Sequence, residues 1–248
     1  MQIHQFLDAT YLKTATQAKI SEQENTQKVV YLLEEAIVHN YKLVMLRVNY
    51  IKLAKRLLAD AKSSVLIGTV IDFPEGNASL EKKIEAVQKA INLGADELDF
   101  VLNYNAFKAG NSNLIKEEVN KCTQFCLANN KVAKFIIEVA ALTNKEIIVI
   151  SQLIKQTVIE NFGLENAKNV FVKSSTGFYK TENNKPNGAT LEIMKLISKN
   201  AKPLKIKAAD GVKDFETAVK MISLGVDRIG TSSAKAIINK EQNTKKGY

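Results

Sequence analysis

Short apolar runs alternate with longer amphipathic segments along most of the chain. Seven runs rich in Val, Ile, Leu and Phe have the length and composition of buried strands. They cover residues 42–48, 64–71, 96–103, 133–140, 169–175, 203–209 and 226–233. Between them, apolar positions recur at helical spacing, for example over 79–94, 113–130 and 214–225. Strands that alternate with helices in this way predict a parallel sheet covered by helices.

One connection between a helix and a strand occurs twice. The segments INLGADELDFV and ISLGVDRIGTS each contain a helix end, a glycine, an aspartate and then a strand. Glycine commonly ends a helix, so the same local structure is predicted at both places. Closing seven strands into a barrel needs one more, and FLDAT near the N-terminus is the candidate.

These elements predict a (β/α)8 TIM barrel that forms a single domain over residues 1–238, followed by a polar tail over 239–248. A doubly wound open sheet is the alternative. A Rossmann nucleotide site is disfavoured because no strand leads into a G-x-G-x-x-G sequence, and no P-loop pattern occurs.

Composition limits the cellular compartments and the classes of partner that we expect. Of 248 residues, 46% are hydrophobic and 25% are charged, which is typical of a soluble globular protein. No apolar run approaches the roughly 20 residues that span a bilayer, and the N-terminus lacks a secretion signal. We therefore expect a cytoplasmic protein without a membrane partner. The net charge of +9 comes from dispersed lysines, which favours a solvated surface over nucleic-acid binding.

Histidine and cysteine are too scarce for several kinds of site. With only two histidines, a His-based triad or a His-rich metal centre is disfavoured. Cys122 and Cys126 lie one turn apart on an expected helix and make no C-x-x-C pair, so we interpret them as buried apolar residues. We expect no metal and no cofactor. The chemistry must then come from Lys, Asp, Glu, Tyr or Ser.

Strand alternation brings three charged residues into one cavity. In a barrel, every second strand residue points inward, and functional side chains lie at the C-terminal ends of the strands. Lys173 closes the FVK run and would point inward at this rim. Asp99 on 96–103 and Lys207 on 203–209 would point inward as well. Three charges, Asp99, Lys173 and Lys207, are therefore predicted to converge.

Two interpretations of these charges are open. An internal salt bridge is the simpler one, and we favour it for Glu97 with Lys134, which would lie nearer the bottom of the barrel. Two lysines beside one aspartate fit a salt bridge less well. An amine attacks a carbonyl only when it is unprotonated, and a second cation in a partly dry pocket favours that form. Lys207 could thus activate Lys173 for Schiff-base formation, while Asp99 shuttles protons.

Glycine and hydroxyl residues follow three of the expected strands. They occur at 174–177, 210–211 and 230–233, all at the same rim. Backbone N–H groups at glycine turns, together with nearby hydroxyls, bind phosphate, and the last strands of a barrel are where such sites usually lie. These runs predict a phosphate subsite beside the lysines.

Together these residues resemble the deoxyribose-phosphate aldolases, class I enzymes that form a Schiff base on a (β/α)8 barrel. The resemblance runs nearly end to end. It is carried by FLDATYLK, VIDFPEGNAS, NLGADELDFVLNYNAFKAGN, KFIIEVAALTNKEI, FVKSSTGF, NGAT, KIKAADGV and DRIGTSS, in the family's order and spacing. The most specific of these are FVKSSTGF and GADELDFVLN.

The resemblance implies reversible cleavage of 2-deoxy-D-ribose 5-phosphate to D-glyceraldehyde 3-phosphate and acetaldehyde. Lys173 takes the Schiff-base position, Asp99 the proton-relay position and Lys207 that of the activating lysine. The resemblance also implies contacts with the substrate or its phosphate, at Asp8, Gly177, Gly211, Gly230, Ser232 and Ser233. The partner is then a small sugar phosphate. Another lysine-dependent sugar-phosphate aldolase, or a sugar-phosphate-binding barrel without activity, remains an alternative.

Several positions depart from the family pattern. Asp210-Gly211 stands where the family usually has two glycines, and a carboxylate beside a phosphate repels it. Met45 and Arg47 replace a frequent cysteine and asparagine. Tyr248 is a candidate to fold over the site, because some relatives also end in tyrosine. The outer helix faces do not reveal which of them meet a partner, so a homo-oligomer such as a homodimer stays open.

Overall fold

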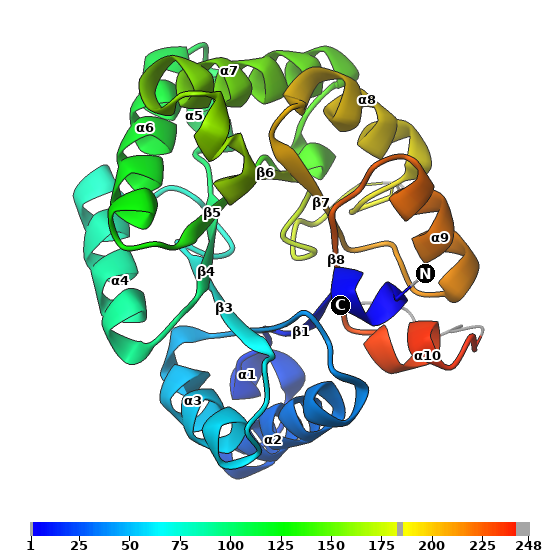
Figure 1. The fold of residues 1–248 in the computed structure, drawn as a ribbon. Coiled ribbons are helices and arrows are strands. Elements are labelled where there is room, and N and C mark those ends of the chain that lie inside the picture. Colours follow the sequence, from blue (N-terminus) through cyan, green and yellow to red (C-terminus); the bar gives the residue numbers. More distant parts are fainter. Residues whose placement is uncertain (1, 183–185, 242–248) are drawn as a thin grey trace.

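Eight parallel strands close into a barrel, and the helices that connect them form a ring around it (Figure 1). The structure is a computed structural model that describes residues 2–182 and 186–241. The strands lie in the order β1 to β8, and β8 pairs with β1. The prediction of a single-domain (β/α)8 barrel is confirmed, including the eighth strand near the N-terminus. The alternative of an open sheet is excluded by the β1–β8 pairing.

The strands are short and the helices between them are longer. The strands are β1 (Leu7–Tyr11), β2 (Leu43–Leu46), β3 (Leu66–Ile71), β4 (Glu97–Val101), β5 (Val132–Ile136), β6 (Val170–Lys173), β7 (Lys205–Ala209) and β8 (Arg228–Thr231). The α-helices are α1 (Ala15–Ala18), α2 (Glu22–His39), α3 (Ile51–Asp60), α4 (Leu80–Leu93), α5 (Tyr104–Lys108), α6 (Ser112–Ala128), α7 (Asn144–Phe162), α8 (Leu191–Ala201), α9 (Phe215–Ser223) and α10 (Ala234–Ile238).

The hydrophobic core lies on both sides of the sheet. Leu98 and Phe100 point outward from β4 and belong to the large core between barrel and helices. Val101 points inward and packs with Tyr104 and Ile136 near the mouth of the barrel. This alternation is the predicted one, and it explains how neighbouring strand residues can serve the core and the interior in turn.

Five of the seven predicted runs extend beyond the ends of their strands, and at two of these ends a polar residue takes a position that alternation did not predict. The run 133–140 was expected to be one strand, but β5 stops at Ile136, and Glu138 adopts a left-handed backbone conformation with φ 55°. By the alternation that turns Asp99 inward, Asn103 at the end of the run 96–103 was also expected to line the interior. Its side chain instead accepts a hydrogen bond from the N–H of Ala106 and begins α5. Apolar composition marks a strand but does not mark where a polar turn interrupts it.

The repeated helix-to-strand connection has the same structure in both places. Gly94 and Gly225 end α4 and α9 with positive φ angles of 105° and 86°. The following aspartates then bind the backbone of the preceding strand. Asp96 Oδ2 accepts a hydrogen bond from Ile67 N at 2.9 Å, and Asp227 Oδ2 accepts one from Ile206 N at 2.9 Å. Each aspartate thus ties the start of its strand to its neighbour.

The structure also bears on the predictions for the cysteines, for membrane-spanning helices and for the tail. Cys122 and Cys126 are buried on α6, and burial raises the pKa of the Cys122 thiol to about 12. None of the helices within the described ranges is long and apolar enough to cross a membrane. Residues 242–248, including Tyr248, lie outside the described residues. The predicted boundary between the barrel and a tail at residue 239 stays a prediction.

Candidate active site

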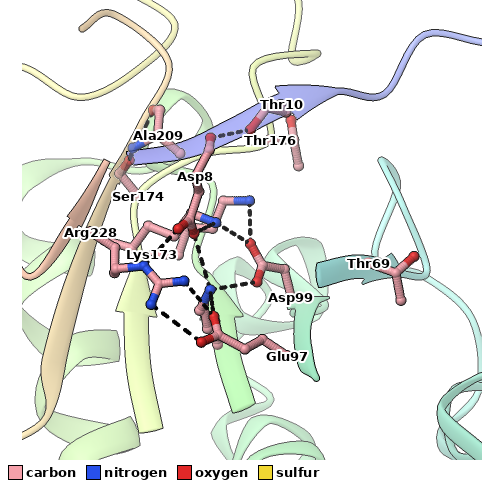
Figure 2. Close-up of polar contacts among 12 residues, drawn as sticks. Asp8, Thr10, Thr69, Glu97, Asp99, Lys173, Ser174, Thr176, Ala209 and Arg228 are labelled. Atoms are coloured by element: carbon pink, nitrogen blue, oxygen red, sulfur yellow. Dashed lines mark hydrogen bonds and ion pairs between the residues drawn. The ribbon is translucent and has the colours of Figure 1, made fainter. Parts of the chain in front are cut away.

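Charged side chains from six strands meet inside the barrel (Figure 2). They all occupy inward positions, and all are at most 5% exposed. The cluster consists of Asp8 (β1), Glu97 and Asp99 (β4), Lys134 (β5), Lys173 (β6), Lys207 (β7) and Arg228 (β8). Four cationic side chains therefore face three carboxylates, and the cluster as a whole carries an excess of positive charge.

The three residues expected to converge do so on a single carboxylate oxygen. Asp99 Oδ2 accepts a hydrogen bond from Lys173 Nζ at 2.8 Å and from Lys207 Nζ at 2.9 Å. Lys173 and Lys207 are also direct partners in the pairing of β6 with β7. The two ammonium groups are thereby held next to each other at the C-terminal half of the barrel.

Asp8 and Glu97 neutralise the lower part of the cluster. Asp8 Oδ2 lies 2.6 Å from Lys207 Nζ and 3.1 Å from Lys134 Nζ, and Asp8 Oδ1 lies 2.6 Å from Arg228 Nε. Glu97 binds Arg228 through both carboxylate oxygens, at 2.8 and 3.2 Å, and also pairs with Lys134. The predicted Glu97–Lys134 pair is present.

These contacts place Asp8 beside Lys207. Its side chain is fully buried and its oxygens are used by Lys134, Lys207 and Arg228. Its expected contact with substrate stays a prediction. The geometry gives Asp8 a role that the sequence did not suggest, which is to hold Lys207 in place through a direct ion pair.

Burial and neighbouring charges separate the pKa values of the cluster. Burial would raise the pKa of Asp8 and of Asp99, but the surrounding cations hold both carboxyls far below their usual range. Burial lowers the pKa of Lys207 to about 8, and the charges of Lys134 and Lys173 assist, while Asp8 and Asp99 oppose the shift. Both carboxylates are thus ionised at neutral pH, while Lys207 exchanges its proton near pH 8.

The opposite happens to Lys134. Burial would lower its pKa, but Asp8, Glu97 and Asp99 together raise it above the usual range of a lysine. Two lysines of one cluster are therefore driven in opposite directions. Lys134 is a permanent cation, whereas Lys207 is placed to move a proton.

A hollow of about 430 Å³, which includes space open to solvent, adjoins Lys173. It is lined by Thr10, Leu12, Lys173, Thr176, Ala209, Asp210, Gly211, Val212, Lys213, Gly230, Thr231 and Ser232. The expected site residues Lys173, Gly211, Gly230 and Ser232 are among these. The expected Asp8, Gly177 and Ser233 are not, although Thr176 precedes Gly177 and Ser232 precedes Ser233 in the chain. The ends of β6, β7 and β8 thus share one hollow, as the glycine and hydroxyl runs predicted.

Several hydroxyls of these runs hold the loops together. Ser174 Oγ donates to Ala209 O at 3.1 Å and accepts from Ala209 N at 2.9 Å, which links the end of β6 to β7 (Figure 2). Thr231 Oγ1 donates to Val212 O at 2.8 Å. These two side chains fix the rim, whereas Ser232 is exposed and faces the hollow.

Gly230 is required by close approach to Lys207. A Cβ atom built on Gly230 would lie 3.0 Å from Lys207 Cε, tighter than most real contacts. Gly230 also lies level with Asp8 in the pairing of β1 with β8. The absence of a side chain therefore leaves room for the lysine that Asp8 holds.

Asp210 lines the same hollow. It has a positive φ of 59°, and a Cβ atom on Gly188 would lie 2.6 Å from Asp210 Cβ. Burial raises the pKa of Asp210, while the N–H of Gly211 and the charge of Lys213 lower it. The Asp210 carboxyl therefore lies next to the backbone of Gly211, which is predicted to bind phosphate.

Arg228 and Glu138 were missed by the sequence reasoning. Arg228 stands two residues before Gly230 on β8, so strand alternation alone could have placed it inward. Glu138 offered no such signal, because the left-handed turn after β5 breaks the alternation on which the other predictions depend.

Comparison with known proteins defines the class to which this barrel belongs. Residues 6–240 match the family described as DeoC/LacD family aldolase. The chain therefore belongs to this family of aldolases, which are lyases.

Individual relatives point to one activity within that class. A deoxyribose-phosphate aldolase of Thermococcus gammatolerans is 33% identical over 98% of both chains. One of Dictyoglomus turgidum is 38% identical over 84% of this chain and 86% of its own. The structure is also similar to a deoxyribose phosphate aldolase of Aeropyrum pernix that is described as a unique tetramer. In that case the TM-score is 0.75 at 25% identity, covering 96% of this chain and 89% of the other.

Proposed function

We propose that this protein is a deoxyribose-phosphate aldolase that reversibly cleaves 2-deoxy-D-ribose 5-phosphate to D-glyceraldehyde 3-phosphate and acetaldehyde. The observation that carries the proposal is the shared Asp99 oxygen, which holds Lys173 and Lys207 together beside the hollow. The named relatives at 33–38% identity support the choice of substrate.

Lys173 acts as the nucleophile. Its neutral amine attacks C1 of the open-chain aldehyde, and loss of water leaves a protonated Schiff base. Removal of the C3 hydroxyl proton turns that C–O bond into a carbonyl and breaks the C2–C3 bond. The electron pair of the broken bond forms a C1=C2 double bond while the C=N π electrons move to nitrogen, which gives an enamine. Glyceraldehyde 3-phosphate leaves at this stage. Protonation of the enamine at C2 and hydrolysis release acetaldehyde and restore the amine.

Lys207 and Asp99 serve this sequence in different ways. Since its pKa lies at about 8, Lys207 can take up and release protons near neutral pH. Its charged form also favours the neutral amine on Lys173 that condensation requires. Asp99 is ionised at rest and keeps both amines in place; it accepts a proton only transiently as it relays protons between them and the substrate.

The rim after β7 and β8 takes the phosphate. Gly211, Gly230 and Ser232 line the hollow, and Lys213 supplies a cation there. Contacts of Asp8, Gly177 and Ser233 with substrate belong to the same proposal. A cytoplasmic location, a role in nucleoside catabolism and a homodimeric assembly remain predictions.

Borohydride trapping with peptide mapping tests the proposal. Incubation with acetaldehyde or deoxyribose 5-phosphate, followed by reduction, should place one covalent adduct on Lys173. The Lys173→Ala variant should show neither adduct nor turnover, whereas Lys205→Leu removes a lysine from the same barrel interior and should keep both. An adduct on another lysine, or turnover in Lys173→Ala, would refute the assignment. Release of acetaldehyde distinguishes this activity from that of another sugar-phosphate aldolase.

A further inference from the structure

Glu138 is a buried acid next to the loop that follows Lys173. Its side chain is 1% exposed. Its backbone has φ 55° and ψ 70°, a conformation that costs a residue other than glycine on the order of 1 kcal/mol or more. Val139 N donates to Ser174 O at 3.0 Å, which seats this turn against the end of β6. A strained backbone that buries a carboxylate at the rim points to a function beyond packing.

The carboxylate binds one residue of the loop, Thr176. Glu138 Oε2 accepts a hydrogen bond from Thr176 N at 3.2 Å and a second, short one from the Thr176 hydroxyl. Glu138 Oε1 is buried and makes no hydrogen bond with any part of the chain that the structure describes. Burying a carboxylate with one oxygen unpaired costs stability. The two hydrogen bonds from Thr176 are the contacts that offset this cost.

These bonds determine how Thr176 can interact with a substrate. A hydroxyl has one proton and two lone pairs. Thr176 Oγ1 donates its proton to Glu138 and accepts a hydrogen bond from Phe178 N at 3.0 Å. One lone pair remains. Thr176 lines the hollow together with Lys173, so towards the hollow its hydroxyl can only accept a hydrogen bond.

We propose that Glu138 is a positioning residue that sets the hydrogen-bond polarity of Thr176 towards the substrate. Ionised Glu138 keeps the Thr176 proton and leaves an acceptor in the hollow. Protonated Glu138 donates its own proton to Thr176 Oγ1, which frees the threonine proton to turn towards the hollow as a donor. This inference rests on the proposed function, because it requires an aldehyde substrate in the hollow.

The surroundings of Glu138 place its pKa, and with it this proton exchange, in the neutral pH range. Burial raises its pKa to about 7, against the opposing effects of the Thr176 hydrogen bonds and the charge of Lys173 on β6. Asp210, after β7, raises the pKa further. Tyr104 on α5 also lies within the influence of the Glu138 charge. Thr176 is therefore an acceptor above pH 7 and a donor below it.

The test compares how kcat/KM for deoxyribose 5-phosphate depends on pH in matched variants. In the unmodified protein we expect a step of about fivefold near pH 7, the size expected of one hydrogen bond. Glu138→Gln offers a carbonyl oxygen that can accept both Thr176 bonds but does not titrate. It should lose this step and keep the ionisation of Lys207 near pH 8.

Three further variants separate position from charge. Thr176→Ser keeps the hydroxyl and should keep the step, whereas Thr176→Val should lose it. Glu75→Gln removes an exposed negative charge from the loop after β3 at the same rim and should leave the step unchanged. A difference infrared titration should also show a protonated carboxyl band with a midpoint near pH 7 that is absent from Glu138→Gln.

The outcomes distinguish this inference from the proposed function. Failure of the unmodified protein to form the Lys173 adduct would overturn both. Adduct formation together with an unchanged pH step in Glu138→Gln would overturn only the role of Glu138. Should that variant not fold, a retained step in Thr176→Val would refute the role by itself.

Discussion

At the scale of single residues, Lys207 is the neighbour of Lys173 that we propose to exchange protons. It contacts both Asp8 and Asp99, and burial lowers its pKa to about 8. Gly230, which lies level with Asp8, leaves space beside Lys207. This one lysine is thus supported by three strands other than its own, which is what a proton carrier needs to keep a fixed position.

Replacing Lys207 by leucine should slow turnover by about 10²-fold or more, the usual contribution of a general acid–base group. The pH–rate profile should also move towards alkaline pH, because the neighbouring cation that favours a neutral amine on Lys173 is gone. Steady-state kinetics from pH 6 to 10 would measure both effects. Lys205→Leu, on the same strand, is the control. A slower variant with an unmoved profile would count against activation by charge.

Asp210 should weaken the binding of a dianionic phosphate. Its carboxyl is charged above its raised pKa, so the repulsion grows as pH rises and fades as pH falls. Asp210→Gly should lower KM for deoxyribose 5-phosphate several-fold at pH 8, and the effect should shrink as the pH falls through the raised pKa of Asp210. KM for unphosphorylated deoxyribose is the reference.

Asparagine at the same position separates charge from backbone strain. Asp210→Asn removes the charge and keeps the side chain in the left-handed conformation. It should reproduce the fall in KM. Glycine alone should add thermal stability, since it relieves a backbone cost of about 1–2 kcal/mol. Equal KM values in the aspartate and asparagine forms would show that the carboxyl turns away from the phosphate.

At the scale of elements, the barrel repeats a connection that fastens each strand to its neighbour. Asp96 and Asp227 each follow a helix-ending glycine and each accept a backbone N–H from the strand before. The repeat was visible in the sequence as a pair of similar segments. The hydrogen bond across to the neighbouring strand was not, because it joins residues 29 and 21 positions apart.

Each of these aspartates should contribute about 1 kcal/mol to stability through its hydrogen bond. Asp96→Ala and Asp227→Ala should therefore lower Tm by roughly 2–4 °C each in a chain of this size. Differential scanning calorimetry would measure the change. The two effects should add in the double variant, since the connections lie apart. A neutral result for both would mean that another donor or water replaces the carboxylate.

At the scale of the whole molecule, the buried ion cluster couples stability to pH. The pKa values of Asp8 and Asp99 are depressed on folding, from 3.8 in the unfolded chain. Their contribution is therefore present above about pH 4 and is lost as pH falls further. Lys207 works the other way. Its pKa of about 8 lies below the unfolded 10.5, so burial of its charge costs stability that is recovered as pH rises between these values.

Thermal unfolding should accordingly show Tm falling steeply below pH 4. The variant Asp99→Asn removes one of the two depressed carboxyls and should flatten that fall, while a surface change such as Glu75→Gln should not. Circular dichroism between pH 2 and 7 is sufficient. An equally steep fall in Asp99→Asn would place the acid sensitivity elsewhere in the protein.

Much of this molecule follows from alternation along the strands. The eight strands, the inward lysines and Asp99 were all predictable, because period-two patterning specifies which side of a sheet a residue occupies. The partners of Asp8 were not, since its sequence neighbours carry no sign of Lys134 or Arg228 more than a hundred residues away. Glu138 was not predictable, because it lies in a left-handed turn where the two-residue alternation of a strand does not hold. Closure of the barrel, rather than local sequence, brings such groups together.

The Asp8–Arg228 pair joins the first strand to the last, across the point where the barrel closes. Strand β8 leaves the ribosome after the other seven strands. Until then Asp8 has no Arg228 to pair with, and Lys207 lacks part of its support. A nascent barrel that lacks only this strand is therefore expected to be inactive, so the reactive site forms only once the barrel can close.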